Sequence, residues 1–223
     1  MAGLTCVWAT LGACTVAAPA RSTEAWAART RVHCMSNSGH DQRRTYLLID
    51  GENVDATLGM SVLGHRPNPD QRPRWDRISQ FAVDAWNQPV TGLFFLNASS
   101  GQLPMSFIQA LIAMGYRPVP LAGDASEKVV DIGIQRTLEA LEGRSGDVML
   151  ASHDGDFVPQ LTKISKSDRK VAVLGFREFV SAKLADIPGV RIYDLEDHIG
   201  AFTEPLPRVR VIPLDSFDPL KFL

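Results

Sequence analysis

The chain has 223 residues, of which 45% are hydrophobic and 22% charged, a composition typical of an ordinary globular protein. It excludes a fibrous or wholly disordered protein, and the length leaves room for one good-sized domain with tails. The formal net charge of −2 excludes general attraction to polyanions. Binding of a nucleic acid would therefore require a local basic patch.

The first 34 residues contain all three cysteines, and the chain has neither a CxxC zinc signature nor a disulfide framework. This usage suits the cytosol, so we expect a cytoplasmic protein. Residues 2–20 carry no charge, but no Lys or Arg precedes them and Gly, Thr and Pro dilute their hydrophobicity. We expect residues 1–44 to be a disordered extension, with a signal peptide or membrane anchor in residues 1–30 as the alternative.

Regular periodicity begins at residue 45 and predicts alternating strands and helices. The expected strands are residues 46–49, 91–99, 116–122, 147–152, 170–176 and 190–195. The expected helices are residues 75–86, 104–115, 126–143, 157–167 and 179–187, and Ser126 is the expected opening residue of the third. The Pro- and Arg-rich residues 63–75 indicate a loop, and residues 203–223 an extended tail.

The apolar runs of these strands are continuous rather than alternating, so both faces of the sheet are expected to be covered. This pattern predicts one doubly wound α/β domain over residues 45–202, with a mainly parallel sheet. Two prolines in residues 116–122 place that strand towards an edge. In such a sheet, sites form beyond the carboxyl ends of the strands, near a switch in strand order.

Acidic residues gather at two of these strand ends. Asp50 follows the first strand, and Ser152, Asp154 and Asp156 follow the strand at 147–152. If the two strands are neighbours, these groups meet in one crevice. Crowded carboxylates repel each other unless a positive charge lies between them, and the common solution is Mg²⁺ or Mn²⁺ bound by oxygen ligands.

A third contributor is Asp131, near the start of the helix predicted at 126–143. It lies seven residues before Leu138, so it points towards the apolar face of that helix. A carboxylate on a buried face is costly unless it is paired, so Asp131 is expected to close the ring of acids. Lys128, one turn earlier, could reach the same rim and hold a phosphate.

Each of these residues also has a simpler interpretation. Asp50 could be a turn residue or helix cap, and Asp154 and Asp156 could cap the next helix. Asp131 could be a first-turn charge, Asn53 a turn amide and Lys128 a solvated surface residue. A catalytic pair of Ser152 and His153 is rejected, because adjacent strand residues point to opposite faces. His153 is instead expected at the rim of the site or behind the residues that form it.

The segments "LLIDGENV", "KVVDIGI" and "ASHDGDFVPQLTKI" resemble, in this order and spacing, the NYN domain family, specifically its LabA-like branch. This family belongs to the PIN-like nuclease superfamily, and the resemblance covers about residues 45–195. It implies a three-layer α/β/α fold and a metal-dependent ribonuclease that acts on RNA. It also implies Mg²⁺ or Mn²⁺ as cofactor, and related nucleases often form homodimers.

Carried over by this resemblance, Asp50 and Asp154 would be metal ligands, and Asp131 and Asp156 would complete the acidic site. Asn53 would position the substrate or a ligand water, and Ser152 would support the site. The family often has Gly where this chain has His153, a change that removes no acid.

Phosphate contacts with RNA would come from two basic clusters, which could equally be solvated charged faces. The candidates, expected around the rim of the site, are Arg66, Arg72, Arg74 and Arg77 in and after the Pro-rich stretch, and Lys163, Lys166, Arg169 and Lys170 around the helix before the strand predicted at 170–176. Trp75 or Tyr116 could stack on a base, but core packing is the better interpretation for both.

Two other functions fit parts of the pattern. A haloacid-dehalogenase-type phosphatase also places an Asp after its first strand, but it needs a second Asp where this chain has Glu52. A PIN-like domain could also be a catalytically silent RNA-binding or regulatory module. The four acids argue against that alternative.

Overall fold

The structure is a computed structural model that describes residues 43–124, 126–208, 212 and 214–222. The extension predicted at 1–44 therefore lies almost wholly outside the described residues. Six parallel strands form one sheet in the order β3-β2-β1-β4-β5-β6. Their bounds are β1 Thr45–Asp50, β2 Val90–Asn97, β3 Tyr116–Leu121, β4 Asp147–Ala151, β5 Val171–Gly175 and β6 Val190–Asp194.

In the residues that the structure describes, six α-helices connect or follow these strands: α1 Gly51–Thr57, α2 Trp75–Trp86, α3 Met105–Ala113, α4 Val129–Glu142, α5 Val158–Ser165 and α6 Ala182–Ala185. A π-helical segment, Leu58–Leu63, continues α1, and 3-10 turns lie at Pro69–Gln71, Gly155–Phe157, Leu214–Ser216 and Pro219–Phe222. Within the described part of the chain, no helix combines the length and apolar character needed to cross a membrane.

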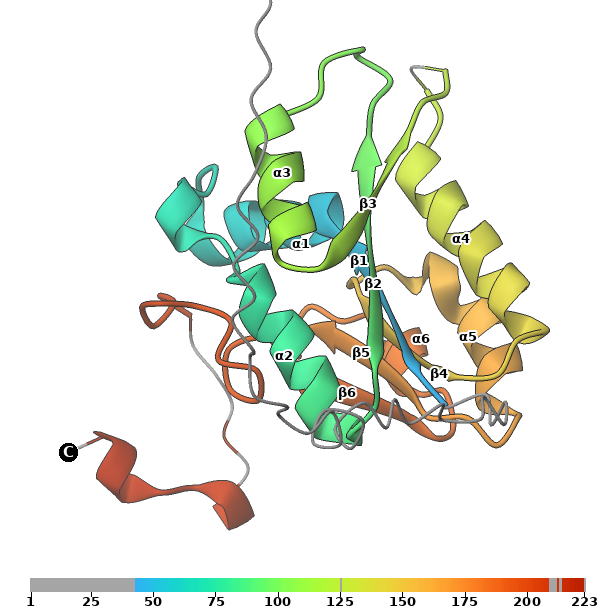
Figure 1. The fold of residues 1–223 in the computed structure, drawn as a ribbon. Coiled ribbons are helices and arrows are strands. Elements are labelled where there is room, and N and C mark those ends of the chain that lie inside the picture. The colour runs from blue at the N-terminus through green and yellow to red at the C-terminus, as the bar shows by residue number, and fades with distance from the viewer. Residues whose placement is uncertain (1–42, 125, 209–211, 213, 223) are drawn as a thin grey trace, which may run out of the picture. The chain divides into compact units, whose positions relative to one another are not determined.

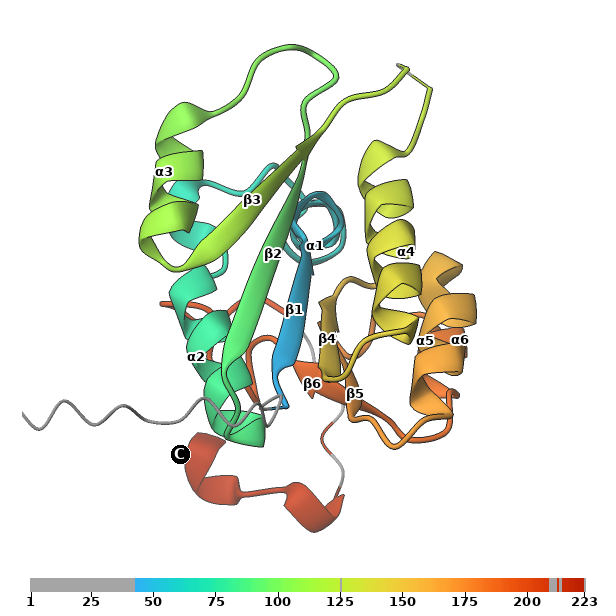
Figure 2. The same cartoon turned by 45° about the vertical axis from the view of Figure 1, so that its right-hand side comes forward.

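The helices form two layers around the sheet (Figures 1 and 2). Side chains of α1, α2, α3 and residues 195–202 pack in one core cluster, on one face of the sheet. Side chains of α4, α5 and α6 pack in a second cluster, on the other face. Because successive strand residues alternate between faces, Leu47 and Ile49 enter the first cluster and Leu48 the second. The predicted three-layer α/β/α sandwich with a parallel sheet is confirmed.

The direction of strand order changes at β1. This strand pairs with β2 on one side and with β4 on the other, so β1 and β4 are the neighbours that the expected crevice requires. The prolines of β3 lie on an edge strand, as predicted, where unpaired backbone positions tolerate them.

The tail expected to be extended contains two 3-10 turns, Leu214–Ser216 and Pro219–Phe222, and three helices also differ from the sequence-based expectation. The expectation placed no helix directly after β1, whereas α1 begins there, capped by Asp50, whose side chain accepts a hydrogen bond from the backbone N–H of Asn53. Helix α4 begins at Val129 rather than near Ser126, because Glu127 is held in a turn by its backbone bond to Asp124. Helix α6 is a single turn of four residues.

A buried arginine fastens the segment after residue 202 to the sheet. The Arg208 side chain is 4% exposed, and its guanidinium lies 2.6 Å from Asp194 and 2.9 Å from Glu196 and pairs with Glu178. It also lies over the ring of Phe176. Burial alone would raise the pKa of Asp194, but backbone N–H groups and Arg208 outweigh burial and hold that pKa below its usual value.

Replacement of Arg208 should therefore destabilise the domain strongly. The substitution Arg208→Met leaves buried carboxylates without their cation, and we expect a loss of about 3–5 kcal/mol in the free energy of unfolding. Urea denaturation measures this loss. The control is Arg191→Met, at an exposed position of β6, and equal stability of the two variants would contradict the prediction.

Candidate functional site

Asp50 and Ser152 meet at the point where strand order changes. Ile49 pairs with Ala151 across β1 and β4, so the next residue of each strand lies beside the other. Ser152 Oγ donates a hydrogen bond of 3.0 Å to Asp50 Oδ2, and the N–H of Asn53 donates one of 3.1 Å to Asp50 Oδ1. Asp50 is 1% exposed. The helix-cap interpretation of Asp50 is thus confirmed, beside its place at the strand end.

Burial raises the pKa of Asp50 to about 6, and the negative charges of Asp131 and Glu52 act in the same direction. The hydrogen bonds from Asn53 and Ser152 oppose this rise but do not cancel it. A positive charge close by would favour the ionised form of Asp50.

Three further acids form a tight group on the same face of the sheet. One carboxylate oxygen from each of Asp131, Asp154 and Asp156 lies within 4.8 Å of the other two. Asp131 comes from the first turn of α4, and the other two come from the segment after β4. Asp154 Oδ1 also caps the 3-10 turn by accepting from the N–H of Asp156 at 3.0 Å. The cap uses one of the two oxygens of Asp154.

The electrostatics of this group favour a cation. Burial raises the pKa of Asp131, and the charges of Asp154 and Asp156 raise it further, against the lowering effect of Lys128. Lys128 Nζ lies 3.3 Å from Asp156 Oδ2 and 3.5 Å from Asp131 Oδ2, although its side chain is 68% exposed. The ammonium group of Lys128 thus pairs with two carboxylates of the group, whereas the sequence suggested that it would contact a phosphate.

The four predicted acids are arranged as a group of three and one buried neighbour. Asp50 interacts electrostatically with Asp131, but the compact group consists of Asp131, Asp154 and Asp156. The donor set is all oxygen, which suits a hard divalent cation such as Mg²⁺ or Mn²⁺. The three carboxylates therefore fit such an ion, with Asp50 behind them.

Asn53 and His153 hold α1 against the segment after β4. Asn53 Oδ1 accepts hydrogen bonds from the backbone N–H and the ring Nδ1 of His153, at 2.8 and 2.9 Å. The N–H of Phe176 donates to His153 Nε2 at 2.8 Å, so Nε2 is unprotonated and the ring proton is on Nδ1. Burial lowers the pKa of His153 to about 4. His153 is a neutral positioning residue, and the oxygen of Asn53 is engaged by it.

The protonation of His153 can be measured directly. We expect the ring to keep the neutral Nδ1–H form down to about pH 4, because burial disfavours the charged ring and Nε2 accepts a hydrogen bond from the backbone N–H of Phe176. Titration of the ring nitrogen chemical shifts by NMR measures this pKa. A midpoint near the usual value of about 6.5 would show that the ring is not held as described.

The bond between Asn53 and His153 should contribute to stability. Asn53→Ala leaves two donors of His153 without their acceptor, and we expect a loss of about 2 kcal/mol or more in the free energy of unfolding. The matched control is Asn97→Ala at the exposed end of β2, where the side chain accepts one bond from Ser99 N. Chemical denaturation measures the free energy of unfolding of both variants. A loss no larger for Asn53→Ala than for Asn97→Ala would contradict a stabilising bond between Asn53 and His153.

The first predicted basic cluster is divided by the structure. Arg66 and Arg72 line a cavity described below, and Arg72 Nε lies 3.1 Å from Asp55 Oδ2. Arg74 pairs with Asp76 at the surface. Arg77 donates two bonds of 2.8 Å to the carbonyls of Gly200 and Phe202, so it fastens the chain after β6.

The second basic cluster is not at the rim, and this corrects the expectation. Helix α5 runs from the carboxyl edge of the sheet to its amino edge, so Lys163 and Lys166 in and after its last turn lie near the start of β5. Lys163 pairs with Glu142 there. Arg169 bonds the carbonyls of Gly146 and Leu141. Parallel topology thus separates these residues from the acids.

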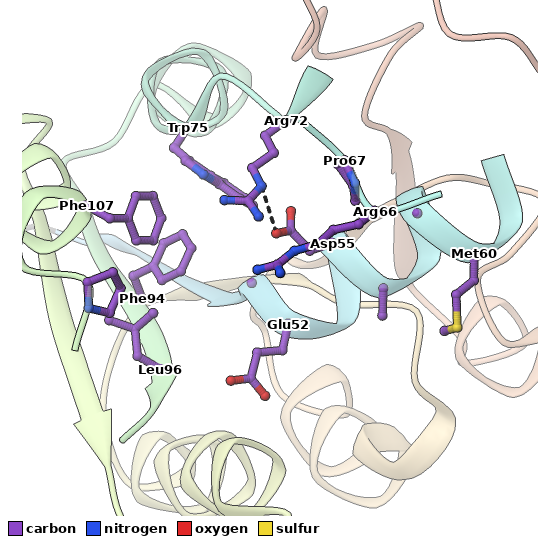
Figure 3. A pocket seen from close by; sticks show the side chains of 14 residues that line it. Glu52, Asp55, Met60, Arg66, Pro67, Arg72, Trp75, Phe94, Leu96 and Phe107 are labelled. Atoms are coloured by element: carbon purple, nitrogen blue, oxygen red, sulfur yellow. Dashed lines mark ion pairs between the residues drawn. The ribbon is translucent and has the colours of Figure 1, made fainter. Parts of the chain in front are cut away.

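A cavity of about 600 Å³ opens at the carboxyl edge, between α1, the π-helical segment, α2 and the start of α3 (Figure 3). Gly51, the residue after Asp50, is part of its wall. Trp75 and Tyr116 are core residues, as expected, but Trp75 also borders this cavity. No local sequence pattern marks this cavity, because its lining comes from four separate segments of the chain.

Comparison with known proteins identifies a sequence family and a fold. The sequence profile described as the NYN domain matches residues 44–189. A solved structure of a protein of unknown function from Vibrio parahaemolyticus is similar, with a TM-score of 0.56 and 21% sequence identity over 71% of this chain and 96% of that one. No curated protein matches this chain.

Proposed function

Because this chain belongs to the NYN domain family, whose members are generally nucleases, we propose that it is a metal-dependent ribonuclease. The proposed reaction is hydrolysis of RNA phosphodiester bonds at the carboxyl edge of the sheet. A cytoplasmic location and membership of the LabA-like branch are further parts of this proposal. A homodimer stays a prediction from the sequence.

One observation carries the proposal most directly. Carboxylate oxygens of Asp131, Asp154 and Asp156 lie within 4.8 Å of one another, and the ammonium group of Lys128 lies against two of them. Three carboxylates at this separation strongly favour a cation between them. The position of Lys128 supports this, since two of these carboxylates already attract its ammonium group.

The proposed roles follow from these positions. Asp131, Asp154 and Asp156 would hold Mg²⁺ or Mn²⁺, which when bound activates water and neutralises charge on the phosphate oxygens. Ser152 and Asn53 fix the carboxylate of Asp50 behind the group. Asp50 would add negative potential that attracts the ion. Lys128, once released from the carboxylates, could contact a phosphate oxygen of the RNA.

The buried position of Asp50 disfavours the phosphatase alternative. A phosphatase of that type needs a carboxylate oxygen of Asp50 free to attack phosphorus. Here the residue is 1% exposed, and each of its oxygens accepts a hydrogen bond.

Asp154→Asn should abolish cleavage, because it removes one charge from the group while it preserves the shape of the side chain. We expect a loss of more than about 100-fold, since even residues that only support metal ligands are worth about 10- to 100-fold. Mixed single-stranded and structured RNAs are incubated with Mg²⁺ or Mn²⁺, with and without EDTA.

The matched control is Asp84→Asn, at an exposed position of α2. Cleavage that requires the added metal and is retained by the control alone supports the nuclease. Equal cleavage by both variants, or none by the wild type, would contradict the proposal. RNA binding without turnover would then favour the silent module.

Lys128→Met should strengthen metal binding, because the ammonium group competes with the ion for Asp131 and Asp156. Calorimetric titration with Mn²⁺ measures the affinity without any need for activity. Lys166→Met, an exposed lysine at the amino edge, is the control. Unchanged or weaker Mn²⁺ binding by Lys128→Met would show that Lys128 does not occupy the ion's position.

A further inference from the structure

The 600 Å³ cavity lies on the opposite face of the sheet from the acids. Phe94 on its wall packs in the cluster with α2, whereas Asp50 and Asp131 face the side of α4. Gly51 and Glu52 at the start of α1 line the cavity directly after Asp50. A chain that crosses the carboxyl edge over α1 would therefore pass from the acids into the cavity.

One side of the cavity is aromatic and aliphatic. Phe94 packs edge-on against both Trp75 and Phe107, with ring centroids 4.9 and 5.4 Å apart. Phe107 and Leu96 are half-buried, so they present apolar surface to the open space. In Figure 3, Phe94, Phe107 and Leu96 stand together on the left, whereas Trp75 lies beside Arg72. Such a wall suits a flat, weakly polar ring.

The other side carries an ion pair with one unused acceptor. Arg72 Nε lies 3.1 Å from Asp55 Oδ2, an ion pair seen in Figure 3. The second oxygen, Asp55 Oδ1, has no hydrogen-bond partner among the described residues. A carboxylate with one unpaired oxygen suits a ligand edge that offers a hydrogen-bond donor.

The charges of the cavity balance. Glu52 and Asp55 contribute two negative charges, and Arg66 and Arg72 contribute two positive charges. The side chain of Arg66 lies close to Asp55 in Figure 3. A balanced lining favours a neutral occupant over an isolated phosphate, which would need an excess of positive charge.

We propose that this cavity binds a nucleobase of the RNA, and that guanine fits it best. Guanine offers two adjacent donors, N1–H and N2–H₂, to the carboxylate of Asp55. Its acceptors O6 and N7 suit an arginine. Its ring would lie along the wall of Phe107 and Leu96, with the flexible, exposed Met60 at the mouth. The place of this base within an RNA chain rests on the proposed function, whereas the binding itself does not.

Binding of mononucleotides tests the proposal without catalysis. GMP, AMP, CMP and UMP are titrated against the full chain by calorimetry. EDTA is present, so that no metal ion bound at the acidic group contributes to nucleotide binding. We expect GMP to bind at least about tenfold more tightly than UMP, because one good bidentate contact discriminates between bases by about this factor. Equal affinity for all four, or no binding at millimolar concentration, would overturn the proposal.

Two variants locate the binding. Asp55→Asn replaces the carboxylate with a group of the same shape and should weaken the binding of GMP by at least about tenfold. Ala56→Trp, at an exposed position on the cavity wall, should block the cavity without disturbing the core. Asp84→Asn is the control on α2. GMP affinity that both cavity variants leave unchanged would show that the base binds elsewhere.

The failures of the two proposals can be told apart. Asp154→Asn should bind GMP like the wild type, because its carboxylate lies outside the cavity. GMP binding without RNA cleavage would support the proposed base-binding cavity and contradict the proposed nuclease activity. Cleavage that depends on Asp154, with no GMP binding, would contradict only the proposal for the cavity.

Discussion

The site depends on the hydrogen bond between Ser152 and Asp50, which exists because β1 and β4 are parallel neighbours in register. Parallel strands end at the same edge, and the change of strand order at β1 opens that edge between two strands distant in sequence. Each strand delivers one polar side chain on the same face. Helix α4 then adds Asp131 from the layer that covers this face.

The sheet edge concentrates negative charge, and the fold counters it in two ways. Backbone N–H groups at the starts of α1 and of the 3-10 turn each bind one carboxylate oxygen, of Asp50 and Asp154 respectively. Lys128 covers two carboxylates of the acidic group from the solvent side. Neither measure buries a positive charge within the group, so an added cation would still be stabilised there. The cavity on the other face, by contrast, is balanced in charge.

The fold was predictable from the sequence, and the site was predictable in part. Continuous apolar runs identified the parallel sheet, and helical periodicity placed Asp131 on the correct face of α4. The positions of Lys163 and Lys166 were not predictable from composition, because only the direction of α5 assigns them to the amino edge. The partnership of Asn53 with His153, and that of Asp55 with Arg72, depend on tertiary contacts that no local pattern encodes.

The most direct test of the central claim is the location of a divalent ion. Crystals of the protein grown with Mn²⁺ should show an anomalous-difference peak between the carboxylates of Asp131, Asp154 and Asp156, with the ammonium group of Lys128 moved away from them. A well-occupied peak elsewhere, or an acidic group still covered by Lys128 at saturating Mn²⁺, would contradict the metal site.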